Sequence, residues 1–255
     1  MRNRTLLLAV AIFFLGCFLA YGDSQRPISG HGKTFLFTAK RLGIPFLKAS
    51  IQIENDIYVQ GRPFCQVRAE VYSVNFGFLF RIHNRFASTM EAETCAPVQY
   101  VKEIDQDGLL KETKNYHQIL TFDPQNQKVS VEKRGEKEKL EVALPPETYD
   151  PLSIFARCYL KENLRPDQDV RMSIYDGVKL RQMVFHPKQE RLKSKLYGDV
   201  EAVCLEATTS FASFDDKDGV IRIWYTNDEK RAPVLMEFDL PAGRIRFELD
   251  EIREI

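Results

Sequence analysis

The sequence predicts a mainly β protein: a long antiparallel sheet, curled into a spiral or an open barrel, with one principal α-helix packed on it or plugging it. Two observations support this prediction. Short runs in which apolar and polar residues alternate recur along most of the chain, separated by turn residues. One stretch, residues 151–162, instead repeats its apolar residues at helical spacing. Many short strands of this kind are typical of a sandwich or a barrel.

The N-terminus, residues 1–22, has the features of a secretory signal peptide. Two arginines precede the unbroken apolar run of residues 6–19, and small residues stand at the −3 and −1 positions before Asp23. The run is short for a membrane span, and polar residues follow it directly. We therefore expect export to the periplasm, a single domain over residues 23–255, and no transmembrane segment in the mature chain.

Cys17 allows a second interpretation of the same segment. Leu15-Gly16-Cys17 resembles the centre of a lipobox, and the protein would then be an outer-membrane lipoprotein anchored through Cys17. Phe14 is unusual three positions before such a cysteine, and Phe18–Tyr21 would be an apolar start for a lipidated chain. Both features favour the cleaved signal peptide. An uncleaved anchor is the third alternative.

Charge and composition argue against a nucleic-acid partner. The 36 basic residues balance the 36 acidic ones and are mixed with them along the chain, so no long-range field attracts nucleic acid or an anionic membrane. With 255 residues and 44% hydrophobic content, the chain can bury a substantial core. Pro145-Pro146 is the only candidate boundary, and we expect the helix after it to join two halves of one curled sheet.

The strand signals extend over almost the whole chain after the leader. Alternating runs cover residues 33–39, 47–53, 65–71, 80–86, 98–104, 118–122, 128–132 and 140–144 before the helix, and 170–174, 180–184, 203–207, 221–225, 234–240 and 245–249 after it. The turns between them contain Gly, Asn, Asp and Pro, which tolerate a positive φ or preset the first turn residue.

The predicted helix has both a start and a stop signal. Asp150 is a good N-cap acceptor, and Pro151 suits the first helical position, where a missing N–H costs nothing. Asn163 can adopt the left-handed conformation that ends a helix, and Pro166 prevents its continuation. The helix is therefore expected to have defined ends.

One face of this helix is apolar and is formed by Leu152, Phe155, Ala156, Tyr159 and Leu160. A helix of about three turns is marginal in water by itself, so its apolar face must dock on the surrounding β-structure. We expect Asp150, Phe155 and Tyr159 to anchor it. Arg157 is expected on the opposite face, in solvent.

Four cysteines remain after the expected cleavage. An even number in an exported chain permits disulfides, and four cysteines allow three pairings. Cys65 and Cys95 flank what looks like one long hairpin, so a disulfide between them is one interpretation, and Cys158 would then pair with Cys204. Free buried cysteines that act as small hydrophobic residues are an equally good alternative.

No stretch has a pattern typical of catalysis, of a metal site or of a cofactor. Residues 30–34 resemble the end of a phosphate-binding loop but enter a strand where a helix is required. Residues 105–108 and 216–219 resemble pieces of calcium loops, and hairpin turns explain both. The four histidines are scattered, without zinc-ligand spacing. We expect no catalytic residue, no cofactor and no metal.

The most distinctive polar run lies at residues 222–234. A hairpin whose turn residues pair locally explains it. The functional interpretation makes Asp228, Glu229 and Arg231, with Trp224, a rim at the mouth of a barrel, where the head group of a ligand or a partner could bind.

Several stretches, taken in order, resemble the domain-of-unknown-function family three-one-zero-eight. They are Leu42-Gly43-Ile44-Pro45, Arg81-x-x-x-Arg85-Phe86, Tyr149–Ser153, Ala202–Glu206 and the hairpin from Trp224 to Val234. The resemblance covers nearly everything after the signal peptide. It implies an exported protein of Gram-negative bacteria without an established activity, and a curled sheet similar to the half-barrels of the Lol-type lipoprotein carriers. It supplies no catalytic residues, and Cys65 and Cys95 are not part of its pattern.

These observations favour a non-enzymatic periplasmic protein. We expect it to bind an apolar ligand, either a lipid or the acyl chain of a lipoprotein, or an envelope protein partner, in support of cell-envelope integrity. One alternative is an exported hydrolase that uses carboxylates near Asp228 and Glu229. A purely structural interaction module is the other.

Overall fold

The computed structural model describes residues 32–75, 80–108, 113–136, 138–162, 164–166, 168–211, 217–241 and 243–255. The strands and the helix of this part follow one another as β1 (Gly32–Arg41), β2 (Ile44–Val59), β3 (Arg62–Ser73), β4 (Phe80–Glu91), β5 (Pro97–Gly108), β6 (Lys114–Asp123), β7 (Lys128–Lys133), β8 (Leu140–Ala143), β9 (Thr148–Tyr149), α1 (Pro151–Leu160), β10 (Val170–Tyr175), β11 (Leu180–Ser194), β12 (Gly198–Phe211), β13 (Lys217–Thr226), β14 (Pro233–Leu240) and β15 (Gly243–Glu254).

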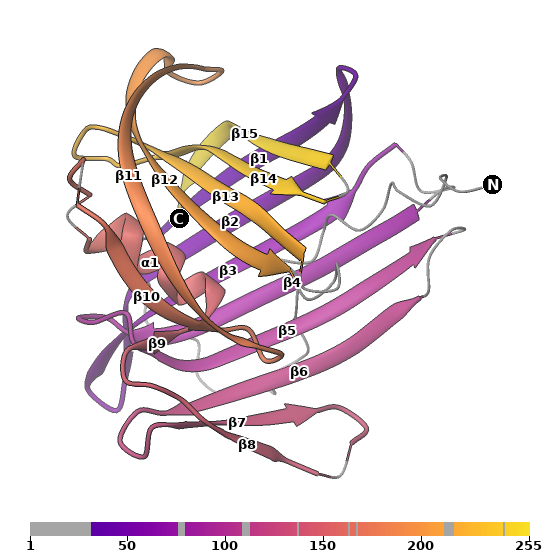
Figure 1. The fold of residues 1–255 in the computed structure, drawn as a ribbon, viewed down its shortest axis with the longest axis vertical. Coiled ribbons are helices and arrows are strands. Elements are labelled where there is room, and N and C mark those ends of the chain that lie inside the picture. The colour runs from indigo at the N-terminus through magenta and orange to yellow at the C-terminus, as the bar shows by residue number, and fades with distance from the viewer. Residues whose placement is uncertain are drawn as a thin grey trace.

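All these strands belong to one 15-stranded sheet, in the order β8-β7-β6-β5-β4-β3-β2-β1-β15-β14-β13-β12-β11-β10-β9. Neighbouring strands are antiparallel, except for the short parallel pair β9 and β10. The sheet curls strongly but keeps two free edges, β8 and β9, so it is not a closed barrel (Figure 1). The predicted fold class, a curled antiparallel sheet with one principal helix, is confirmed.

Most of the core lies on the concave face of this sheet. Along β3 and β4, buried residues alternate with more exposed ones, and the buried set includes Cys65, Val67 and Ala69 on β3 and Phe86 on β4. This period of two is the pattern from which the strands were predicted. The inward-facing residues of the other strands join them in one apolar cluster.

α1 lies inside the curl and fills part of it (Figure 1). The ring of Phe155 is 6.1 Å from the ring of Tyr225 on β13. The ring of Tyr159 is 5.5 Å from that of Phe35 on β1, in an edge-on arrangement. The helix therefore packs against strands from separate parts of the sheet, as expected of a plug.

The helix is buried more widely than the predicted apolar face. Residues 151–156 and Cys158 are all buried, because the sheet curls around the helix instead of covering one side. The helix ends at Leu160, with Lys161 as its C-cap. Asn163, the expected left-handed residue, lies outside the described residues.

The prediction that Arg157 points into solvent is wrong. Its guanidinium lies 4.9 Å from the ring centre of Tyr149 and donates a hydrogen bond to the hydroxyl of that residue. Its Nε is 2.5 Å from a carboxylate oxygen of Glu162. Tyr149, which stands just before the helix, thus lies against this side of α1, so this face also has protein against it.

The turn between β10 and β11, near one end of the strand order, contacts β5 and β6, near the other end. Lys102 Nζ donates to the carbonyl oxygen of Asp176 at 2.6 Å, and Gln118 Nε2 donates to that of Gly177 at 3.1 Å. Gly177 has a φ of +86°, and a Cβ there would lie 3.0 Å from Leu120 Cδ1. A glycine is needed at this position both for the turn and for the close approach to β6.

Candidate functional site

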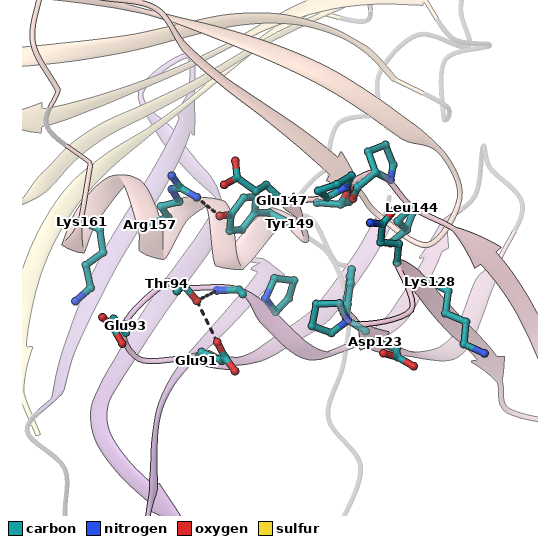
Figure 2. A pocket seen from close by; sticks show the side chains of 18 of the residues that line it. Glu91, Glu93, Thr94, Asp123, Lys128, Leu144, Glu147, Tyr149, Arg157 and Lys161 are labelled. Carbon is teal, nitrogen blue, oxygen red and sulfur yellow. Dashed lines mark hydrogen bonds between the residues drawn. The ribbon is translucent and has the colours of Figure 1, made fainter.

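Two pockets lined by described residues flank α1. The first, which we call the proline pocket, lies between α1 and three connecting segments: residues 91–97, 122–128 and 144–149 (Figure 2). It encloses about 560 Å³, and its walls include Pro97, Pro124, Pro145 and Pro146. The second, the rim pocket, encloses about 750 Å³ at the C-terminal end of α1.

The strap of residues 144–149 explains why the proline pocket exists. Leu144 donates its backbone N–H to Gln127 O at 2.8 Å, which holds the start of the strap to the β6–β7 turn. Pro145 and Pro146 then have no N–H to offer a neighbouring strand, so β8 cannot continue. The chain crosses from the edge strand β8 to the edge strand β9 without pairing, and the space beside α1 stays open.

The middle of the proline pocket is apolar. Phe122 and Leu144 are 8% and 6% exposed and line it together with Pro97 and the buried Tyr149. These side chains come from the ends of separate strands, so no single stretch of sequence carries the pocket. A pocket of this size with apolar walls and a few polar groups is typical of small-molecule sites.

Charged side chains surround this apolar middle, and most of them already have partners. Lys128 lies 3.1 Å from Glu141, and Glu91 lies 3.0 Å from Arg62. In the described part of the chain, Lys161 makes no ion pair, although it is exposed and lines the pocket. Figure 2 shows Lys161 at the same end of the pocket as Glu93. This end is therefore the one with a cation left for a ligand.

A group of buried thiols lies behind one wall of the pocket. Burial raises the pKa of Cys65 to about 12, and the neighbouring Cys95 adds to the rise. Burial likewise raises the pKa of Cys158 to about 12, with smaller effects of charged neighbours and of Cys95. Cys95, in the 91–97 turn, thus lies near a β3 thiol and a helix thiol. All three are free thiols in this structure, and the disulfide between Cys65 and Cys95 stays a prediction.

The suggested pairing of Cys158 with Cys204 is wrong. Cys204 is opposite Trp224 in the register of β12 and β13, one position away from the pair Val203 and Tyr225. Tyr225 faces α1. Because successive side chains of a strand point to opposite faces, Cys204 lies on the face of the sheet turned away from the helix.

The structure brings three of the four predicted rim residues together. Asp228, Glu229 and Arg231 line the rim pocket, whose floor includes Tyr159 and Tyr225. Trp224 does not join them, because it is on the opposite sheet face to Tyr225 and its indole N–H donates to Glu190 at 2.8 Å. The tryptophan is therefore no part of this rim.

Local contacts explain most of the rim. Asp228 Oδ1 accepts hydrogen bonds from Thr226 Oγ1 at 2.6 Å and from the backbone N–H groups of Lys230 and Arg231 at 3.1 Å. The Arg231 guanidinium donates to the carbonyl oxygen of Glu162, just after α1. Asp228 thus shapes the hairpin turn, and Arg231 fastens this turn to the end of the helix.

Asp150 occupies the N-cap of α1 and is completely buried. Its carboxylate accepts the backbone N–H groups of Leu152 and Ser153 at 2.8 and 3.0 Å, and the hydroxyl of Ser88 on β4 at 2.7 Å. Burial raises the pKa of this carboxyl to about 6, against the hydrogen bonds that lower it. The cap therefore also ties the helix to β4.

The described residues contain no group of three or more His, Cys, Asp and Glu side chains arranged to hold a metal ion. Nor does any helix in this part of the chain have the length and apolar character needed to cross a membrane.

The fold and the two pockets define a class of protein: a β-barrel-like protein with a curled, open sheet and an internal helix. Residues 34–250 match the model of the family described as "Protein of unknown function (DUF3108)", and the chain belongs to this family. The resemblance noted in the sequence is thereby confirmed. No curated protein matches the chain.

A solved structure shares the fold. The crystal structure of a β-barrel-like protein of the domain of unknown function DUF1849, from Brucella abortus, is similar with a TM-score of 0.56 and 12% sequence identity. The match covers 90% of this chain and 99% of the other. At this level of sequence identity, the similarity supports a shared fold and nothing further.

The sequence did not reveal the proline pocket. Its one local signal is Pro145-Pro146 directly after a four-residue strand. The sequence predicts only a candidate boundary there, whereas in the structure this pair lies in the strap that crosses from β8 to β9.

Proposed function

We propose that this protein is a non-enzymatic binding protein of the bacterial envelope, exported to the periplasm, which holds a lipid or the acyl chain of a lipoprotein in the proline pocket. The observation that carries the proposal is the composition of this pocket: an apolar middle and, at one end, Lys161, a cation without an ion pair among the described residues. An acyl chain matches the middle, and a polar or zwitterionic head group matches the end, where Glu93 and Lys161 both lie.

The volume of the pocket and its surroundings support this ligand class. About 560 Å³ is within the range of about 300–1,000 Å³ that small-molecule sites occupy. Each buried CH₂ of a chain contributes about 0.8 kcal/mol, so even a partly inserted chain gains affinity. The carboxylate of Asp228 is occupied by its own turn, and no observation favours the hydrolase alternative.

Ligand binding is tested with a lysophospholipid that carries an NBD label on its acyl chain. We expect its fluorescence to rise on binding, and unlabelled lysophospholipid to displace it. Ala96 lines the pocket, so Ala96→Phe should fill the space and weaken binding at least about tenfold. Ala92→Phe, in the same turn but not in the pocket lining, is the matched control.

Equal binding by the Ala96→Phe and Ala92→Phe variants would exclude the proline pocket as the site. Native mass spectrometry of protein isolated from cells should also show a bound lipid mass, which Ala96→Phe removes. A wild-type protein without any lipid, in both measurements, would refute the proposed function.

The export part of the proposal has its own test. The periplasmic fraction should contain a mature chain that begins at Asp23. A diacylated chain that begins at Cys17 would instead make the protein an outer-membrane lipoprotein.

A further inference from the structure

A group of polar side chains lies on the concave face of β4 and β5. Asn84 is completely buried, and Lys102 and Gln106 are 7% and 6% exposed. The register pairs Ile82 with Gln106 and Phe86 with Lys102, so Asn84, between these two positions of β4, is a diagonal neighbour of both polar residues of β5. We call Asn84, Lys102 and Gln106 the inner polar cluster.

The unused polar atoms of this cluster are hydrogen-bond donors. Asn84 Oδ1 accepts the backbone N–H of Asp105 at 2.8 Å, which fixes the orientation of the amide and leaves Nδ2 as the free atom. In the described structure neither Asn84 Nδ2 nor Gln106 Nε2 has a partner. A buried donor without a partner costs about 1–3 kcal/mol, so such groups call for a bound molecule to satisfy them.

Lys102 adds a positive charge on the same face of the sheet as these amides. Its ammonium donates to Asp176 O at 2.6 Å and lies 5.9 Å from the ring centre of Tyr116, which leaves other N–H bonds of the ammonium available. The carboxylate of Asp176 is 2.8 Å from Arg181 and so is already paired. Burial lowers the pKa of Lys102 to about 8, and the side chain stays mostly cationic at neutral pH.

We propose that the inner polar cluster is a binding site for a carboxylate, supplied either by a fatty acid or by a small organic acid. Two amide N–H donors suit the two oxygens of a carboxylate, and Lys102 supplies a positive charge on the same sheet face. Hydrogen bonds to a charged acceptor are about twice as strong as neutral ones. Ile82, Phe86 and Ile104 lie on the same face and suit an apolar body attached to the acid group.

This site is separate from the proline pocket. Pro97, which lines the pocket, and Gln106 are nine positions apart on β5, and nine residues of a strand span about 30 Å. The inference therefore goes beyond the proposed function and can fail independently of it.

The test is a calorimetric titration of oleate, below its micelle concentration, into protein freed of lipid. Gln106→Met keeps the size of the side chain but removes Nε2. Asn84→Asp keeps the oxygen that accepts the Asp105 N–H and replaces the free donor by a negative oxygen. Gln99→Met is the control, because strand alternation puts Gln99 on the outer face of β5.

We expect oleate to bind the wild type, to bind Gln106→Met at least about tenfold more weakly, and not to bind Asn84→Asp. The control should bind as the wild type does. The urea midpoint of Gln106→Met should not fall, because an apolar side chain replaces an unsatisfied buried amide. Lost affinity with retained stability would distinguish a binding site from a structural one.

Acetate distinguishes the two sources of the carboxylate. Binding of acetate with the same sensitivity to Gln106→Met would identify small organic acids as ligands, whereas binding of oleate alone would identify fatty acids.

Unchanged oleate affinity in both variants, or binding of neither oleate nor acetate by the wild type, would overturn the inference. A crystal structure with oleate in the medium and only a water molecule at Asn84 Nδ2 would also do so. The variant Ala96→Phe separates the two proposals. If it abolishes oleate binding while Gln106→Met does not, the inner polar cluster fails and the proline pocket stands.

Discussion

The two ends of α1 are held by different means. At the N-terminal end, Asp150 is buried and bonded to its own helix and to Ser88, and Phe155 is 1% exposed. At the C-terminal end, Leu160 is half-buried, Lys161 is exposed, and the helix is fastened through the side chain of Arg231. The first end belongs to the core of the protein and the second to the borders of its two pockets. Stability is thus expected to depend on the first end, and ligand access on the second.

Replacement of Phe155 by alanine tests this difference most strongly. It removes a buried ring next to Tyr225 and leaves a cavity, which typically costs about 3–5 kcal/mol of unfolding free energy. Leu160→Ala, at the other end, should cost less than half as much, because Leu160 is only partly buried. Urea melts of both variants give the comparison. Equal losses would show that the two ends contribute alike.

Cys65 and Cys95 offer a second test, on the turn that borders the proline pocket. If they form a disulfide after export, alkylation under denaturing, non-reducing conditions should leave both thiols unlabelled. Reduction should then lower the free energy of unfolding by about 3 kcal/mol, a typical contribution for a disulfide that closes a loop of this length. Labelling of both thiols would establish that they stay free. The structure places Cys95 near Cys65 and Cys158, so the alkylation pattern of Cys158 should be read in the same experiment.

The N-cap should make stability depend on pH. The pKa of Asp150 is about 6 in the folded protein and 3.8 as its ordinary value. The folded state therefore binds the proton of Asp150 more tightly than the unfolded state does. The contribution of Asp150 to the free energy of unfolding is thus greatest below about pH 4 and is lost as the pH rises to about 6. Two pKa units correspond to about 3 kcal/mol at most.

Asp150→Asn isolates this effect, because asparagine also caps helices well and does not ionise. We expect the wild type to lose stability relative to Asp150→Asn between pH 4 and pH 6.5, measured by urea melts at each pH. A constant difference over this range would mean that the hydrogen bonds from Ser88 and from the helix N–H groups keep the carboxyl ionised.

The same two ends show what sequence could predict. Asp150 and Pro151 are adjacent, so local chemistry was enough to place the start of the helix, and the alternation of residues 65–71 was enough to place a strand. Arg231 and Glu162 are 69 positions apart, and no local pattern reveals their contact. The hairpin of Arg231 could be predicted as a hairpin, but not as a clamp on α1.

The candidate sites follow the same division. The proline pocket arises where register brings together three connections that are distant in sequence, and its only local trace is Pro145-Pro146. The inner polar cluster depends on which residues of β4 and β5 are diagonal neighbours. A register shift of one residue would turn Asn84 and Gln106 to opposite faces, so the sequence could not specify the cluster before the pairing was known.

Arg157 provides a prediction of intermediate size. It pairs with Glu162 and stacks on Tyr149, and a partly exposed cation–π contact contributes about 0.5–1 kcal/mol. Arg157→Ala should therefore cost about 1 kcal/mol in a urea melt. Arg157→Lys should restore only part of this loss, because lysine lacks the planar group that stacks on the ring. A silent Arg157→Ala variant would mean that the strap of residues 144–149 is held without this side chain.

The smallest effect is expected for Arg231, although its contact joins residues 69 positions apart. Its guanidinium donates to one carbonyl, that of Glu162, and a hydrogen bond of this kind contributes about 0.5–1.5 kcal/mol net. Because the hairpin turn is already shaped by Asp228, Arg231→Gln should lower stability by less than about 1 kcal/mol. Hydrogen exchange should nevertheless speed up in the last turn of α1, since the clamp on this end is lost. Glu229→Gln, an exposed neighbour in the same turn, should change neither quantity. If Arg231→Gln leaves the rate of hydrogen exchange in the last turn of α1 unchanged, as Glu229→Gln does, this end of the helix is held by packing of Tyr159 and Leu160 alone. The contrast between the two ends then disappears.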